Sequence, residues 1–206
     1  MLPVPAKPLP SGVWAIASHL EAESLPNWMA NAAAASAWTF RLPKARPDQV
    51  SEMLQKLRAE APWLAIHADW DWAIACQADA IIAGSRSLSL TDLRSAIQSQ
   101  CAGFMQLGYA AHSQDEVQTA IRDGAEFAFF SPIWDTPSKA GILKPRGCEA
   151  LRTASQKKLP LIALGGIQTP QQVAECQAAG AHGVAVLRAA TDAGLLREMQ
   201  AAWHQA

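Results

Sequence analysis

The sequence predicts a single (β/α)8 barrel, and three observations support this. Short apolar runs typical of buried strands alternate eight times with segments typical of helices. Right-handed crossovers make such strands parallel, and eight units within 206 residues close most simply into a barrel. The alternative is an open doubly wound sheet, but the GxGxxG turn typical of many such sheets does not follow the first apolar run.

The strands are expected where short apolar runs occur. The first run is G-V-W-A-I-A-S at 12–18, and the sixth, F-A-F-F at 127–130, suits a strand that is covered on both faces. The predicted strands are residues 12–18, 37–41, 63–67, 80–83, 104–107, 127–130, 159–164 and 183–187.

Helices are expected between these strands, and several carry start signals. Pro47 suits the first turn of a helix, the segment S-Q-D-E at 113–116 forms a capping box, and Thr169 precedes Pro170 as an N-cap. The predicted helices are about residues 25–35, 70–77, 113–123, 147–155, 169–180 and 193–203, with two more around residues 50–57 and 93–97.

The composition indicates one domain over residues 12–206, preceded by a flexible N-terminal arm. The first eleven residues hold four of the thirteen prolines, which is typical of a loose segment. Half of the residues are hydrophobic and 17% are charged, as expected for a folded protein with a real core.

Charge and cysteine content narrow the function classes. The net charge of -1 predicts no nucleic-acid partner. The sequence contains no apolar run of 18 residues, so no membrane span is predicted. The four cysteines contain no CxxC pair, which argues against a zinc or redox site. We therefore expect a cytoplasmic protein with reduced thiols.

Active sites of this fold form at the carboxyl ends of the strands, and the sequence places polar residues there. The loop after 127–130 offers two hydroxyls and an ammonium that suit a phosphate or diphosphate, although an ordinary polar loop would also carry them. Gly165-Gly166 would let backbone amides approach a phosphate, or would simply form a turn. The candidate binding residues are Thr39, Arg41, Thr136, Ser138, Lys139, Gly165, Gly166, Leu187 and Arg188.

His112 is the best candidate for a general acid/base, because imidazole exchanges protons near neutral pH. The alternative is a histidine that packs beside a helix start. Asp69 and Asp71 suggest a metal, but two carboxylates at a helix start are more often capping charges, so no metal ligand is predicted.

Four segments resemble the thiamine phosphate synthase / thiazole tautomerase (TenI-like) family of (β/α)8 barrels. They are S-P-I-W-D-T-P-S-K at 131–139, A-L-G-G-I-Q-T-P at 163–170, A-G-A-H-G-V-A-V-L at 179–187 and A-H-S-Q-D-E-V at 111–117. The last is similar to the S-T-H-S segment of the family. The likeness covers the C-terminal half well and stays in register through the N-terminal half.

For the synthase branch, the resemblance implies a Mg²⁺-dependent joining of hydroxymethylpyrimidine diphosphate to thiazole phosphate. Thr136, Ser138 and Lys139 would then bind the diphosphate, and the glycine pair with the turn at 187–188 would bind the thiazole phosphate. The chain departs from that pattern where the family has metal-binding aspartates. Ala68 and Ser87 stand at those two positions, and Thr39 and Arg188 replace a glutamine and a serine.

For the tautomerase branch, the resemblance implies an isomerase without cofactor that aromatises a thiazole carboxylate phosphate. His112 stands at the histidine position of that branch and would move the proton, while Lys139 would neutralise carboxylate or phosphate charge. We expect this function, with a small phosphorylated thiazole or pyrimidine as partner. Two alternatives stay open: a Mg²⁺-dependent synthase in which Asp69 or Asp71 replaces the lost ligand, and a non-catalytic barrel that binds phosphate ligands. Assembly as a homodimer is also left open.

Overall fold

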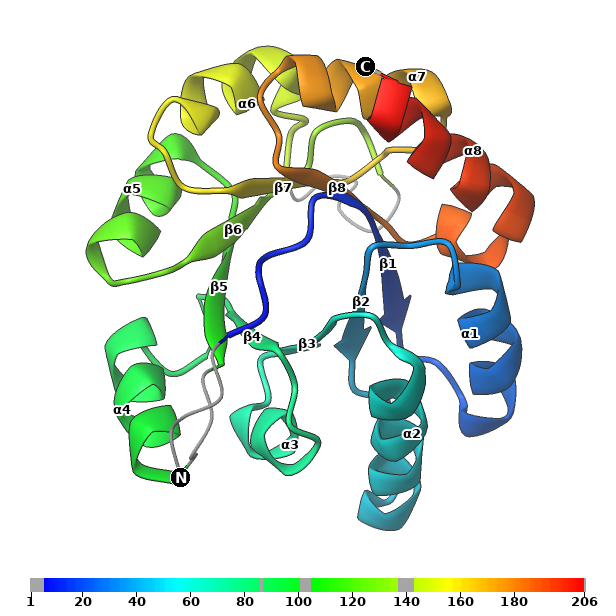
Figure 1. Ribbon diagram of the computed structural model, residues 1–206. Helices are drawn as coiled ribbons and strands as arrows, with labels where there is room; N and C mark the ends of the chain where they lie inside the picture. Colours follow the sequence, from blue (N-terminus) through cyan, green and yellow to red (C-terminus); the bar gives the residue numbers. More distant parts are fainter. Residues whose placement is uncertain (1–5, 86, 101–104, 137–142, 206) are drawn as a thin grey trace.

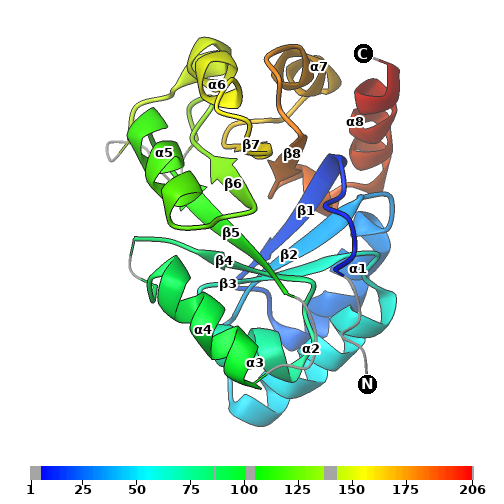
Figure 2. The same cartoon turned by 60° about the vertical axis from the view of Figure 1, so that its left-hand side comes forward.

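The fold is a closed barrel of eight strands surrounded by helices, as the sequence predicts. The computed structural model describes residues 6–85, 87–100, 105–136 and 143–205. The strands follow one another around the barrel in chain order, each parallel to the next, and β8 closes the ring against β1. Figure 1 shows the helices as an outer ring, and Figure 2 shows the same arrangement from the side.

Each strand is followed by a helix. The strands are β1 (Gly12–Ser18), β2 (Ala37–Arg41), β3 (Leu64–His67), β4 (Ala80–Ala83), β5 (Gln106–Ala111), β6 (Phe127–Phe130), β7 (Leu161–Leu164) and β8 (Gly183–Val186). The α-helices are α1 (Leu25–Ala32), α2 (Pro47–Glu60), α3 (Trp70–Ala75), α4 (Leu90–Gln100), α5 (Gln114–Arg122), α6 (Gly147–Ser155), α7 (Pro170–Ala178) and α8 (Ala193–Gln205). Short 3-10 turns lie at Ala22–Ser24 and Ala189–Thr191.

The predicted fifth strand, 104–107, is wrong in its bounds. The observed strand starts at Gln106 and runs to Ala111, while residue 104 lies outside the described residues. Gly108 and Ala110 lack the bulky side chains typical of strands, but they pair with β6 and leave space for its aromatic rings. A Cβ at Gly108 would collide with the ring of Phe127, so packing between strands determines the residue here.

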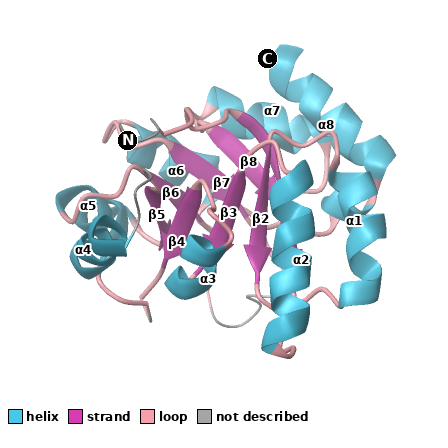
Figure 3. Cartoon of the chain, turned by 60° about the horizontal axis from the view of Figure 1, so that its bottom comes forward, coloured by secondary structure: helices cyan, strands magenta, loops and turns pink. Residues whose placement is uncertain are grey.

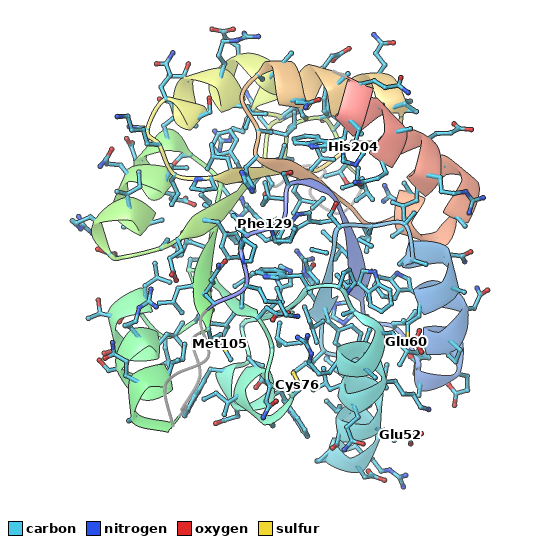
Figure 4. All side chains as sticks on the ribbon, in the orientation of Figure 1. Glu52, Glu60, Cys76, Met105, Phe129 and His204 are labelled. Atoms are coloured by element: carbon cyan, nitrogen blue, oxygen red, sulfur yellow. The ribbon has the colours of Figure 1, made fainter. Side chains whose placement is uncertain are left out.

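Two apolar layers hold the barrel together. One lies between strands and helices, and Figure 3 shows this arrangement of helices outside strands. The other fills the barrel interior and is built on Trp14, Trp63, Phe127 and Phe129, with Phe129 labelled near the centre in Figure 4. Their ring centroids lie 4.9–6.1 Å apart. The alanines that line the same interior leave room for these rings, so a packed core supports the site from below.

The segment before β1 crosses the amino-terminal end of the barrel (Figure 1). The backbone oxygen of Lys7 accepts a hydrogen bond from Gln106 Nε2 (2.9 Å), and that of Pro10 accepts one from Trp14 Nε1 (3.0 Å). Leu9 packs against the interior layer. Residues 1–5 of the predicted arm lie outside the described residues. The rest of the arm covers the amino-terminal end of the barrel.

Across the described residues, no helix is both long enough and apolar enough to cross a membrane.

Candidate active site at the barrel mouth

Two adjoining cavities open at the carboxyl ends of the strands. The larger, of about 590 Å³, lies over β3, β4 and β5 and has a size typical of small-molecule sites. The smaller, of about 80 Å³, lies over β7 and β8. Arg41, Ser131 and Leu164 line both cavities, so one ligand can occupy them together.

His112 lines the larger cavity, and hydrogen bonds fix both its backbone N–H and its imidazole ring. Its backbone N–H donates to Glu116 Oε2 (2.7 Å), one turn into α5. Ser113 caps the same helix by accepting from the backbone N–H of Glu116 (3.1 Å), as the capping box predicts. The helix start therefore fixes the backbone of His112 directly after β5.

The ring of His112 is oriented by Ser131, the residue after β6. His112 Nδ1 lies 3.0 Å from the carbonyl oxygen of Ser131 and 3.2 Å from its hydroxyl. A carbonyl oxygen can only accept, so Nδ1 carries the proton and donates it there. In the neutral ring, Nε2 then has the lone pair, which is the form a general base requires.

A second histidine, His67, lies across the same cavity at the end of β3. Its Nε2 is 3.2 Å from the hydroxyl of Thr39, whose side chain is fully buried, and its ring packs 5.6 Å from that of Phe129. Burial, and to a smaller extent the positive charge of Arg41, lower the pKa of His67 to about 3. His67 is therefore neutral throughout the physiological pH range.

This lowered pKa predicts a pH dependence of stability. Between pH 3 and an unfolded value of about 6.5, the unfolded chain binds a proton on His67 that the folded protein does not. The free energy of unfolding should be unaffected by this group above pH 6.5. As the pH is lowered from 6.5, the free energy of unfolding should decrease by at most about 1.4 kcal/mol per pH unit.

Urea denaturation of the wild type and of His67→Phe at pH 7 and pH 5 tests this expectation. The variant should lose less stability than the wild type between the two pH values. An identical loss in both proteins would show that His67 does not carry the effect.

The turn after β7 is shaped by two glycines that approach the loop after β6. Gly165 and Gly166 have φ of 103° and 74°, in the left-handed region. A Cβ at Gly165 would lie 2.8 Å from Pro132, and one at Gly166 would lie 2.6 Å from the Cβ of Trp134. Backbone hydrogen bonds from Ile133 to Leu164 and from Trp134 to Gly165 hold the two segments together. Both positions therefore require glycine.

This turn also presents hydrogen-bond donors to the smaller cavity. Within the described part of the chain, the backbone N–H groups of Gly166 and Ile167 have no acceptor, and both residues line the cavity. Arg41 and Arg188 line it as well and contribute positive charge. Such a combination of amide donors and guanidinium groups suits an anionic group of the ligand.

The other predicted site residues are distributed as follows. Thr136, Leu187 and Arg188 line the smaller cavity, and Arg188 is exposed. Thr39 lies beneath the larger cavity, where it contacts His67. Ser138 and Lys139 lie outside the described residues.

The residues of the mouth do not fit a Mg²⁺ ion of the kind that the synthase resemblance implies. Within the described ranges, no group of three His, Cys, Asp or Glu side chains could hold a metal ion. Asp69 lines the larger cavity, but its Oδ1 caps α3 by accepting from the backbone N–H of Trp72 (3.3 Å). Mg²⁺ sites of this type rely on carboxylates, so we derive no step through a metal.

Sequence analysis does not single out Ser131, which orients His112 through its backbone oxygen. The sequence places His67 at the exit of the third strand, where it could act like His112, but it does not predict the contact of His67 with Thr39. Ser131 follows Phe129 by two positions, so the alternation of side chains in β6 is a signal that would direct it to the barrel interior.

Comparisons with known proteins agree with this architecture. The family model described as thiamine monophosphate synthase matches residues 14–190. A thiamine-phosphate synthase of Chloroflexus aurantiacus is 34% identical over 133 residues, which cover 64% of this chain and 58% of the relative. A thiamine-phosphate synthase of Lactococcus lactis subsp. cremoris is 32% identical over 146 residues, which cover 70% and 65%. The matched stretches thus span about three fifths of these relatives.

A solved structure shares the fold. The thiamine phosphate pyrophosphorylase of Pyrococcus furiosus superposes with a TM-score of 0.77 over 95% of this chain and 96% of that one. The two sequences are 21% identical, so this likeness supports the barrel architecture alone.

Proposed function

The chain belongs to the thiamine monophosphate synthase family, and from this premise we propose that it is an enzyme of thiamine biosynthesis that acts on a small phosphorylated thiazole. The turn after β7 supports the phosphate part of this proposal, because its backbone offers amide donors, unpaired within the described residues, beside Arg41 and Arg188. The adjoining cavity of about 590 Å³ has room for the heterocycle.

Within this family we infer an isomerase, a metal-independent thiazole tautomerase, with His112 as the catalytic residue. The observation that carries this inference is the contact of His112 Nδ1 with the carbonyl oxygen of Ser131 (3.0 Å). It orients a neutral imidazole and would stabilise the imidazolium that forms when Nε2 takes a proton. The same proton returns at a second position of the ligand, outside the ring that becomes aromatic, so the enzyme is regenerated and no oxidant or metal is consumed.

Phosphate binding is assigned to the glycine turn and its neighbours. The cavity that would hold the phosphate is lined by Gly165, Gly166, Leu187, Arg188 and Thr136. Ser138 and Lys139 follow Thr136 in the chain, and we propose that Lys139 neutralises negative charge on the ligand.

A second candidate is a thiamine phosphate synthase, which would be a transferase. The names of the relatives favour it over the isomerase. The mouth of the barrel favours the isomerase, because Asp69 is the one carboxylate among the described residues that line the larger cavity, and it caps α3. A synthase would need Mg²⁺ to neutralise the diphosphate leaving group, and this set of residues is poorly suited to bind it.

The two candidates are separated by proton NMR of a thiazole carboxylate phosphate with the purified protein in the presence of EDTA. We expect the tautomer to convert faster than in buffer, at a rate that added Mg²⁺ leaves unchanged. A trace equal to that of buffer would contradict the isomerase. The same sample supplied with hydroxymethylpyrimidine diphosphate, thiazole phosphate and Mg²⁺ would then distinguish a synthase from a barrel that only binds phosphate ligands.

A further inference from the structure

Arg41 carries a positive charge that no residue in the described part of the chain neutralises. It ends β2 and lines both cavities, and its guanidinium forms no ion pair or hydrogen bond with the described residues. Arg41 is half-buried, and burial lowers the pKa of its guanidinium. A desolvated guanidinium without a partner is costly, so a ligand anion is the natural partner at this position.

His67 lies beside this charge, and Thr39 determines which of its nitrogens carries the proton. The hydroxyl of Thr39 is fully buried, and His67 Nε2 is its one partner in the described residues, at 3.2 Å. A buried hydroxyl hydrogen needs an acceptor, so Thr39 donates and Nε2 accepts. The neutral ring therefore has its proton on Nδ1.

The Nδ1–H group of His67 is thus a donor in need of an acceptor. Among the described residues it has no partner, and His67 lines the same cavity as Arg41. The charge of Arg41 is one of the causes that keep His67 uncharged, and this places the two groups within electrostatic reach of each other. One fixed cation and one neutral donor therefore face the same space.

We propose that Arg41 and His67 form a second anion subsite, which adjoins the turn of Gly165 and Gly166 proposed to bind the phosphate (the phosphate turn) and takes a carboxylate group of the ligand. This inference rests on the proposed function for the identity of the ligand. The charge balance determines the class of anion. Among the described residues that line the larger cavity, Arg41 is the one Lys or Arg. Its single positive charge matches a monoanionic carboxylate better than a diphosphate, which would carry several negative charges. His67 cannot supply a second positive charge, because it stays neutral.

Thr39 has a positioning role in this subsite. Its hydroxyl does not need to touch the ligand, because it acts by holding His67 Nε2 as an acceptor and Nδ1 as a donor. Without that hydroxyl the ring could adopt the other tautomer and present a lone pair to the carboxylate, which would repel it.

The test is isothermal titration calorimetry with two probes, a thiazole carboxylate phosphate and the same thiazole phosphate without its carboxylate. His67→Phe keeps a flat ring but removes the donor, and Arg41→Gln removes the charge. Each variant should weaken binding of the carboxylated probe about 10- to 100-fold. His67→Phe should change binding of the other probe less than about threefold. Arg41 also lines the smaller cavity, so Arg41→Gln should weaken binding of the other probe too, but by a clearly smaller factor than binding of the carboxylated probe. Thr39→Val keeps the ring of His67 and should lower the selectivity for the carboxylated probe by a smaller factor.

Equal weakening of both probes, unchanged binding of both, or failure of the wild type to prefer the carboxylated probe would each overturn the subsite. If His67→Phe does not fold, Arg41→Gln and Thr39→Val decide the outcome through the selectivity ratio. Turnover is measured separately by NMR, so a wild type that selects the carboxylate but does not isomerise it would refute the proposed function alone. A wild type that isomerises the ligand with no dependence of selectivity on these residues would refute the subsite alone.

Discussion

Replacing His112 with alanine is expected to lower kcat of the proposed isomerisation by about 10²- to 10⁴-fold, the usual contribution of a general acid/base. Binding of thiazole phosphate should change little, because the phosphate turn lies over β7 and β8 and does not involve this side chain. Single-turnover NMR for the chemical step and calorimetry for affinity separate the two effects. The imidazole is oriented by Ser131 before the ligand arrives, so its loss removes chemistry more than binding.

Two further variants make this prediction sharper. His112→Gln retains an N–H group that can donate to the Ser131 oxygen but cannot take a proton, so its kcat should fall as far as that of the alanine variant. His204→Gln is a matched control, because His204 is exposed on α8 and contacts Gln200, which accepts a hydrogen bond from Val13 at the start of β1, opposite the barrel mouth. If both His112 variants lost affinity and activity in parallel, the residue would be a binding group and the assigned catalytic role would be refuted.

Replacing Gly166 with alanine is expected to cost about 2–5 kcal/mol of stability and to weaken binding of thiazole phosphate at least about tenfold. Two costs add up: an alanine at φ 74° is strained by roughly 1–2 kcal/mol, and a crowded site adds about 1–3 kcal/mol. The new Cβ would lie 2.7 Å from the backbone oxygen of Asp135, and backbone cannot move aside easily. Any relief must displace the turn whose amides face the phosphate.

Gly124→Ala provides the control for backbone strain. Gly124 has φ of 87°, and a Cβ there meets nothing within 4 Å, so its substitution carries the conformational cost without the collision. Urea denaturation of both variants should show a larger loss for Gly166→Ala, and calorimetry should show reduced affinity in that variant only. Equal losses of stability, with affinity retained, would mean that the loop after β6 moves freely and does not constrain the turn.

The order and identity of the strands could be predicted from the sequence because burial on both faces leaves a short apolar run. The run at 127–130 coincides with β6, and the run at 12–18 coincides with β1. The bounds of the fifth strand could not be predicted, because Gly108, Ala110 and Ala111 are small residues with weak strand propensity, and Gly108 is required by its fit against the ring of Phe127. That information resides in a neighbouring strand, so the segment itself does not carry it.

The location of the site followed from the same topology, since the carboxyl ends of barrel strands converge at one mouth. The partnerships within it did not. The contact of Thr39 with His67 depends on the register of β2 against β3, and that of His112 with Ser131 depends on β5 against β6. Each strand taken by itself shows which residues are candidates for the site. The tautomer of each imidazole, however, depends on which atom of a neighbouring strand or its following loop lies beside the ring.

The covered amino-terminal end of the barrel has a consequence for ligand traffic. The interior is filled by Trp14, Trp63, Phe127 and Phe129, and the chain from Lys7 to Pro10 lies across the end beneath them. Under the proposed function, substrate would enter and product would leave through the same opening at the mouth. Product and substrate would then compete for the turn after β7 that is proposed to bind the phosphate. The architecture therefore predicts competitive product inhibition, so that turnover would depend on how quickly the product is removed.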